Sequence, residues 1–214
     1  RDFRVFIVMV CMLGIFHILG FFEVQSVELS LWFAMINSFM SVLIILAALP
    51  LLEMIFSRTT NIKLIELSDF NSPLLKKLMV EAPGTYHHSL MTASLAEQAA
   101  TAIGADALLT RTGAYYHDIG KLKNPEYFIE NQNKNENPHD NLSPSMSGLV
   151  LISHVKDGVA LARKYKIDEI VIDFIRQHHG TSFIQYFYFR ALEHSKDVNE
   201  QDFRYPGSTT TSTE

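Results

Sequence analysis

The 214-residue sequence has one cysteine, Cys11, and no internal repeat. A single thiol cannot form an intramolecular disulfide or a metal site made of several thiolates, and its isolation fits a reducing compartment. Basic residues are also few, because 18 lysines and arginines stand against 23 aspartates and glutamates. A formal net charge of -5 argues against a broad basic face for DNA or RNA polymers. No segment alternates apolar and polar residues as a half-buried strand does, so the fold class is predicted to be all-α.

Apolar residues make up 48% of the chain and are crowded into its first quarter. Residues 5–22 and 29–52 form two runs without a formally charged side chain. A helix of about 20 apolar residues can cross a bilayer, so residues 1–58 are predicted to form a transmembrane helical hairpin. A signal peptide is disfavoured because the second run follows at once, without a small-residue cleavage site between the two. Two buried core helices are the other alternative, although a chain of this size offers little to bury them.

Lysine and arginine flank the outer ends of this pair of runs, whereas the connecting loop carries Glu23 and Glu28 and no basic residue. The positive-inside rule therefore places both termini, and the domain that follows, on the cytoplasmic side. We expect a multi-pass membrane protein with membrane lipid as one of its partners. The first residue is Arg1 and not methionine, so we also expect the chain to be part of a longer protein.

Helix caps and breakers divide the sequence after residue 58 into helical segments. Ser72-Pro73 and Ser143-Pro144 each pair an N-cap residue with a first-turn proline. Asp106 can cap another helix, and Gly104 and Gly180 are stop signals. We predict a linker helix within residues 59–72, a helical bundle over 73–207 and a polar tail over 208–214. Within the bundle, helices are predicted over residues 73–82, 86–103, 107–118, 144–164, 168–179 and 182–195, with a loop over 131–141.

Nine histidines are the most unusual count in the composition. Neutral imidazole and carboxylate are frequent metal ligands, and six such residues lie at predicted helix ends or midpoints: His88, His117, Asp118, His154, His178 and His179. An aspartate has two oxygens and can bridge two cations, which together can clamp the attacking and leaving oxygens of a displacement at phosphorus. A lone helical histidine is more often structural, as we expect of His17, His139 and His194. His87 is a candidate for a supporting role beside a ligand.

Lys121 follows Asp118 by three residues. A lysine at this place supplies a point charge where a phosphate would bind, and we predict that it contacts the substrate. The alternative is a solvated surface lysine, and the residues alone leave the two interpretations open.

The segment from His117 to Lys121, HDIGK, resembles the signature of the HD superfamily of phosphohydrolases. Longer segments resemble the seven-transmembrane receptors with an intracellular HD hydrolase domain, which include the PgpH-type cyclic di-AMP phosphodiesterases. These segments are EAPGTYHHS (81–89), GAYYHDIGK (113–121), ENQ with NPHDNLSP (130–144), SHVKDG (153–158) and HHGT (178–181). The resemblance extends from residue 64 to residue 207 and implies a bacterial membrane protein whose HD domain lies in the cytoplasm.

The same resemblance implies a two-metal site, usually of iron or manganese, that hydrolyses cyclic di-AMP to linear pApA. By motif, His88, His117 and Asp118 would bind one metal. Asp118 would bridge to a second metal held by His154, His178 and His179. Asp118 and Lys121 would be the catalytic residues, with Lys121 also binding the substrate. The expected partners are cyclic di-AMP, membrane lipid and, in a homo-oligomer, further copies of the chain.

One departure from the family pattern concerns the residues after FRYPG (203–207), where the family continues into helices that carry another aspartate ligand. This chain ends instead in STTTSTE. Asp197 and Asp202 precede the FRYPG segment and are poor substitutes, so one metal would lack this further carboxylate ligand. Two alternatives follow. One is a catalytically impaired membrane signalling module that binds a cyclic dinucleotide, and the other is an HD-type phosphohydrolase that acts on other nucleotides.

Overall fold

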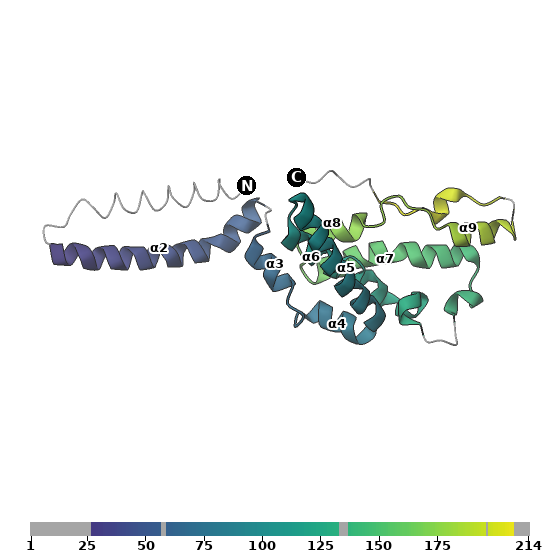
Figure 1. The fold of residues 1–214 in the computed structure, drawn as a ribbon, viewed down its shortest axis with the longest axis horizontal. Coiled ribbons are helices and arrows are strands. Elements are labelled where there is room, and N and C mark those ends of the chain that lie inside the picture. The colour runs from purple at the N-terminus through teal and green to yellow at the C-terminus, as the bar shows by residue number, and fades with distance from the viewer. Residues whose placement is uncertain (1–26, 57–58, 133–136, 196, 208–214) are drawn as a thin grey trace. The chain divides into compact units, whose positions relative to one another are not determined.

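The computed structural model describes residues 27–56, 59–132, 137–195 and 197–207 (Figure 1). The chain divides into two compact units, Arg1–Arg58 and Thr59–Glu214. Every named element in the described residues is a helix. The β-type pairing there is limited to an isolated bridge between Phe183 and Arg204. The predicted all-α fold class is therefore confirmed for the described part of the chain.

In the first unit the structure describes one helix, α2 (Val27–Phe56). It covers the second apolar run, and several of its large apolar side chains, including Trp32, Phe39 and Leu46, are exposed. The first apolar run, residues 5–22, lies outside the described residues. Among the helices that the structure describes, none is long and apolar enough to cross a membrane. The predicted transmembrane helical hairpin, and the multi-pass membrane location drawn from it, are thus not supported.

The second unit consists of helices joined by short turns. Its elements in chain order, with η for a 3₁₀ helix, are α3 (Asn61–Leu67), α4 (Pro73–Glu81), α5 (Pro83–Ile103), α6 (Ala107–Tyr116), η1 (Ile119–Lys123), η2 (Pro125–Tyr127), η3 (Ile129–Asn131), η4 (Pro138–Asn141), α7 (Pro144–Lys164), α8 (Glu169–Gln177), α9 (Gln185–Leu192) and η5 (Glu200–Phe203). The end of the predicted loop over residues 131–141 is a 3₁₀ helix, η4. The Asn137 side chain starts it by accepting a hydrogen bond from the His139 backbone N–H.

Local capping explains where several of these helices begin and end. The side chains of Ser72, Asp106 and Ser143 each accept a hydrogen bond from a first-turn backbone N–H, at 3.4, 2.9 and 3.3 Å. These bonds confirm three predicted helix starts. Gly104 ends α5 with a φ of 72°, a left-handed conformation that glycine adopts easily because it has no Cβ. At its other end α5 begins at Pro83, before the predicted start at residue 86, because proline suits the first turn of a helix.

An apolar core holds α3, α4, α6 and α8 together. Leu78 of α4, Tyr116 of α6 and Ile172 of α8 are fully buried in it, and burial of such apolar area is the main force that stabilises a bundle. The Tyr116 hydroxyl also donates a hydrogen bond of 2.7 Å to the backbone carbonyl of Leu67, at the end of α3. The segment that the sequence marks as a linker, residues 59–72, thus contributes a helix to this core.

A close backbone approach joins η1, which follows Asp118 directly, to α7, which carries His154. A Cβ built on Gly120 would lie 1.8 Å from the His154 carbonyl oxygen and 2.5 Å from the Gly158 nitrogen. Only glycine permits this approach, and it brings α7 against the chain beside Asp118. Helix α5, which carries His88, packs along α6 in the same unit (Figure 1).

Candidate metal centre

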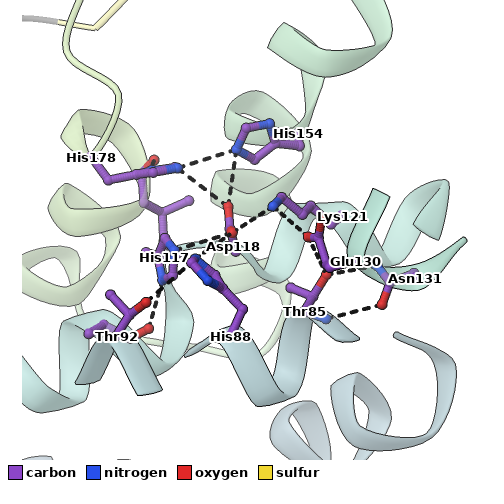
Figure 2. Close-up of polar contacts among 12 residues, drawn as sticks. Thr85, His88, Thr92, His117, Asp118, Lys121, Glu130, Asn131, His154 and His178 are labelled. Atoms are coloured by element: carbon purple, nitrogen blue, oxygen red, sulfur yellow. Dashed lines mark hydrogen bonds and ion pairs between the residues drawn. The ribbon is translucent and has the colours of Figure 1, made fainter. Parts of the chain in front are cut away.

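Six ligand-type side chains from α5, from α7 and from the residues that follow α6 and α8 converge in one cluster, and Figure 2 labels five of them, all but His179. Their ligand atoms form two groups that share Asp118, and within each group the atoms lie within 4.8 Å of one another. The first group contains His88, His117 and Asp118, and the second contains Asp118, His154, His178 and His179. The structure thus brings together all six residues that the sequence singles out as metal ligands.

Asp118 lies at the centre of the cluster and is only 3% exposed. Its Oδ1 atom lies 3.3 Å from Nε2 of His154 and 3.4 Å from Nε2 of His178. Its Oδ2 atom lies 3.2 Å from Nε2 of His117 and 3.8 Å from Nε2 of His88. Figure 2 shows the two oxygens directed to these two sets of imidazoles. This is the arrangement that a bridging carboxylate requires.

Three of the imidazoles are oriented by their own helices. His117, His154 and His178 each place Nδ1 within hydrogen-bonding distance of the backbone carbonyl three residues earlier, at 2.7, 2.5 and 2.9 Å. A carbonyl oxygen can only accept, so Nδ1 carries the proton in each case. In a neutral imidazole the inward Nε2 atom then keeps its lone pair for a metal ion.

The atoms of the second group have the unpaired acceptors that a cation site requires. Asp118 Oδ1 is buried and has no hydrogen-bond partner in the described structure. It faces the Nε2 atoms of His154 and His178, which lie only 3.3 Å from each other. With both imidazoles neutral, three acceptor atoms meet without a donor, and buried acceptors in this state are costly. A divalent cation would stabilise all three, and nitrogen with carboxylate oxygen suits iron, manganese and zinc.

Protonation states in the cluster follow from burial and from these close contacts. Burial alone would raise the pKa of Asp118, but the imidazoles of His117, His154 and His178 outweigh it and hold the pKa well below its usual range. Burial alone would lower the pKa of His117, yet the Asp118 carboxylate, 3.2 Å from its Nε2 atom, favours the protonated imidazole and raises that pKa on balance. Burial, together with the neighbouring imidazoles of His178 and His154, lowers the pKa of His179 to about 3. Asp118 is therefore ionised and His179 neutral near pH 7, as metal ligands must be.

Lys121 lies inside the site, with only 13% of its side chain exposed. Its Nζ atom lies 2.8 Å from Asp118 Oδ2 and 2.7 Å from Glu130 Oε1, and it also lies 4.9 Å above the Phe128 ring. Burial alone would lower the pKa of Lys121, but the carboxylates of Asp118 and Glu130 raise it on balance. A solvated surface lysine is thus excluded. The phosphate contact stays a prediction.

A polar network on the far side of Lys121 links it to the start of α5. Thr85 donates a hydrogen bond of 3.0 Å from Oγ1 to Glu130 Oε1, and its backbone N–H donates one of 3.0 Å to Asn131 Oδ1. The Asn131 amide returns a bond of 2.8 Å to Thr85 Oγ1. A Cβ on Gly84 would lie 1.8 Å from the Glu130 carbonyl oxygen, so α5 and η3 are in backbone contact. Sequence reasoning missed the role of Glu130, whose partners are distant in sequence.

The other histidines, and His88 at the edge of the cluster, differ in how exposed they are to solvent. His88 has half of its side chain exposed, so it forms the solvent-facing edge of the cluster, and His87 beside it is exposed. His139 is buried, and its Nε2 atom donates a hydrogen bond of 2.9 Å to the Tyr127 carbonyl. His194 is exposed, and His17 lies outside the described residues. His87, His139 and His194 thus belong to neither ligand group, whereas His88 belongs to the first.

The family of the chain follows from comparison with known proteins. Residues 85–205 match the model of the HD domain, and this match covers more than half of the chain. The chain therefore belongs to the HD-domain family.

Two curated relatives are cyclic-di-AMP phosphodiesterases named PgpH. The one from Bacillus subtilis is 48% identical over 172 residues, which is 80% of this chain and 24% of the relative. The one from Listeria monocytogenes is 46% identical over 182 residues, which is 85% of this chain and 25% of the relative. The chain thus spans about a quarter of the length of these relatives. Its HD domain is homologous to theirs, and they are hydrolases.

A solved structure shows that the similarity to PgpH extends to the fold. The crystal structure of the Listeria monocytogenes PgpH HD domain in complex with cyclic-di-AMP is 50% identical to this chain, with a TM-score of 0.63. The superposition covers 66% of each chain. The fold of the second unit is therefore that of an HD domain.

Proposed function

We propose that this chain carries a two-metal phosphodiesterase site that hydrolyses cyclic di-AMP to linear pApA. The observation that carries the proposal is Asp118, whose two buried oxygens face two separate sets of imidazoles. Its Oδ1 atom has no hydrogen-bond donor among the described residues. The choice of cyclic di-AMP rests on 50% identity to an HD domain that was solved in complex with that nucleotide.

The two ligand groups define where the metals would be held. His88, His117 and Asp118 would hold one ion. Asp118 would also be a ligand of a second ion, together with His154, His178 and His179. Iron and manganese are the ions we propose, since imidazole and carboxylate ligands suit both. Such a pair of ions supplies positive charge to both the attacking and the leaving oxygen of a displacement at phosphorus.

The protein residues prepare this chemistry. Backbone carbonyls hold His117, His154 and His178 in the tautomer that leaves Nε2 free. Lys121 adds a buried ammonium group beside Asp118, and a charge in this position can offset the negative charge that develops on phosphoryl oxygens. In the overall reaction, water adds across one P–O3′ bond of the cyclic dinucleotide. One water proton ends on the released 3′ oxygen, and the product carries a free 5′ phosphate.

A turnover assay with a metal-loaded protein tests the proposal. The whole chain is loaded with Mn²⁺ or Fe²⁺ and supplied with cyclic di-AMP, and metal content and pApA are measured. We expect two ions per chain and release of pApA, with neither in Asp118→Ala, which retains its helical circular dichroism. Hydrolysis by Asp118→Ala at limiting metal would contradict the shared-ligand arrangement. Hydrolysis of other nucleotides in a panel, but not of cyclic di-AMP, would favour the alternative HD phosphohydrolase.

A second candidate function is a module that binds the cyclic dinucleotide without cleaving it. Its basis is that the group of His88, His117 and Asp118 offers three ligands, and no further carboxylate of the described residues joins it. Asp197 and Asp202, for instance, are exposed and outside both groups. One metal per chain, with nucleotide binding but no pApA, would support this candidate over the enzyme.

Attachment to a bacterial membrane with the HD domain on the cytoplasmic side stays a prediction from the basic residues around the two apolar runs. Protease added outside sealed cells should then leave the HD domain intact. Cleavage near residues 131–141 from outside would contradict this orientation.

A further inference from the structure

His179 differs from the other buried imidazoles in how its ring is held. His117, His154 and His178 each donate a hydrogen bond from Nδ1 to a backbone carbonyl of the same helical segment. No described residue forms a hydrogen bond with the ring of His179, although a nitrogen of this ring belongs to the same ligand group as Asp118 Oδ1. Some other contact must therefore fix the orientation of this ring.

Three rings contact the His179 ring: His178 at 4.1 Å and His154 at 5.1 Å are inclined to its plane, by 44° and 84°, and only Tyr205 among these three stacks on its face. The rings of Tyr205 and His179 are stacked, with centroids 4.0 Å apart and an interplanar angle of 16°. The same tyrosine meets the His154 ring edge-on, at 5.9 Å and 76°. A stacked neighbour restrains the plane of the imidazole through dispersion contacts and leaves both ring nitrogens free.

Tyr205 is itself held by a segment that is anchored on both sides of it. Its backbone N–H donates a hydrogen bond of 3.0 Å to the Ser182 carbonyl, and Ile184 donates one of 2.9 Å to the Phe203 carbonyl. Phe203 is almost fully buried. A Cβ on Gly207 would lie 2.3 Å from the Gly180 carbonyl oxygen. Residues 203–207 are thus laid along residues 180–184, immediately after the two adjacent histidines.

We propose that Tyr205 is a positioning residue that orients His179 for metal binding, with its ring face in the role that a backbone carbonyl has for the other three histidines. The inference rests on the proposed metal function of the cluster. Partners that orient a metal ligand typically contribute about 10–100-fold to metal affinity. The contact depends on the aromatic ring and not on the hydroxyl, which has no hydrogen-bond partner among the described residues.

The test is a titration of the whole chain with Mn²⁺, followed by calorimetry, with no nucleotide present. We expect Tyr205→Ala to weaken binding at one of the two sites by about 10–100-fold and Tyr205→Phe to leave it within about threefold of the wild type. Tyr186→Ala is the matched control, because Tyr186 is an exposed tyrosine of α9. It should not alter metal binding. Equal weakening by Tyr205→Phe and Tyr205→Ala would assign the effect to the hydroxyl and overturn the inference.

A double-mutant cycle with His179→Ala separates ring positioning from damage to the fold. If Tyr205 acts through His179, Tyr205→Ala should have no further effect on affinity in the His179→Ala background. The same loss in both backgrounds would mean that Tyr205 supports the fold only, and the inference would be wrong. If the wild-type chain binds no Mn²⁺, the proposed function itself is contradicted. If the wild type binds Mn²⁺ and Tyr205→Ala binds it with the same affinity, only this inference is contradicted.

Discussion

At the scale of single residues, Lys121 connects the metal cluster to a second carboxylate. Its ammonium group lies between Asp118 Oδ2 and Glu130 Oε1, at 2.8 and 2.7 Å. Two carboxylates around one buried ammonium leave a net negative charge before a metal binds. If Asp118 also ligates a metal, as we propose, the lysine would be in a position to act on an anionic substrate beside the cluster.

Removal of the Lys121 ammonium should therefore affect turnover more than metal binding. We expect Lys121→Ala to keep two metals per chain and to lose roughly 10²–10³ in kcat, as is typical when one electrostatic contact to developing charge is removed. Lys121→Arg should restore only part of the rate, because the planar guanidinium differs in reach and geometry. Metal analysis and steady-state kinetics measure both quantities. A normal kcat at saturating metal would exclude the phosphate role, and loss of metal would show that Lys121 supports Asp118 instead.

Glu130 should contribute to stability in a pH-dependent way. Burial alone would raise the pKa of Glu130, but the Lys121 ammonium lowers it below the ordinary value of 4.5. A carboxylate with a depressed folded-state pKa adds stability above its unfolded-state pKa, and this stability is lost as the pH falls through the folded-state pKa. We expect Glu130→Gln to lower the free energy of unfolding by about 1 kcal/mol at pH 7, a modest value because Glu130 is only partly buried. Urea unfolding between pH 3 and pH 7 measures the difference, which should fade below pH 4.5.

Glu169→Gln is the control for that experiment. Glu169 also has a pKa lowered by a basic neighbour, Arg163, but it is exposed at the protein surface. Its effect should be smaller and should disappear in high salt. A Glu130→Gln effect that is equal at all pH values would indicate that the shape of the side chain matters and its charge does not.

At the scale of elements, the contact between η1 and α7 sets the distance between Asp118 and His154. Gly120 lies so close to α7 that a Cβ would meet two backbone atoms, the His154 oxygen and the Gly158 nitrogen. Backbone atoms of a helix cannot move aside as a flexible side chain can. The two elements must therefore separate if any side chain is added at this position.

Gly120→Ala should accordingly damage both stability and metal binding. We expect a loss of at least about 1–3 kcal/mol in the free energy of unfolding, the usual cost of overpacking, and weaker binding at the group that includes His154. Gly104→Ala is the control, because a Cβ there meets nothing within 4 Å, although its φ of +72° is unfavourable for alanine. The control should cost about 1–2 kcal/mol and leave metal affinity unchanged. Normal metal affinity in Gly120→Ala would mean that α7 can shift without moving His154.

At the scale of the whole molecule, the cluster joins helices that are far apart in the sequence. Its ligand-type residues lie on α5 and α7 and directly after α6 and α8, so a bound ion would tie four helices of the second unit together. An ion that binds the folded state and not the unfolded state stabilises the fold by mass action.

Metal removal should therefore lower the thermal stability of the second unit. At a free metal concentration 100 times the Kd, each site adds about 2.7 kcal/mol, which corresponds to a Tm shift of roughly 5–10 °C for a domain of this size. Scanning calorimetry with and without a chelator measures the shift, and Asp118→Ala should show none. An identical Tm in chelated and metal-loaded wild-type protein would contradict metal binding at the cluster.

The sequence by itself determined those features that depend on neighbours within one helical turn. The helix starts at Ser72, Asp106 and Ser143 are examples, because each cap bonds to an N–H three residues further on. The identity of the six candidate ligands also came from sequence, through the resemblance of short motifs such as HDIGK. The all-α fold class followed from helical periodicity and from the lack of alternating strands.

Only the tertiary structure decided the contacts between segments that are distant in the chain. Glu130 pairs with Lys121 and Thr85 because η3 packs on the start of α5, and Tyr205 stacks on His179 because residues 203–207 are laid along residues 180–184. No local pattern marks such partners, since their distance is set by how whole helices pack around a shared core. The physical reason is the sequence distance over which the interactions act. A helix cap forms its hydrogen bond within one turn, whereas the contacts of Glu130 and Tyr205 form only when segments distant in the sequence pack together.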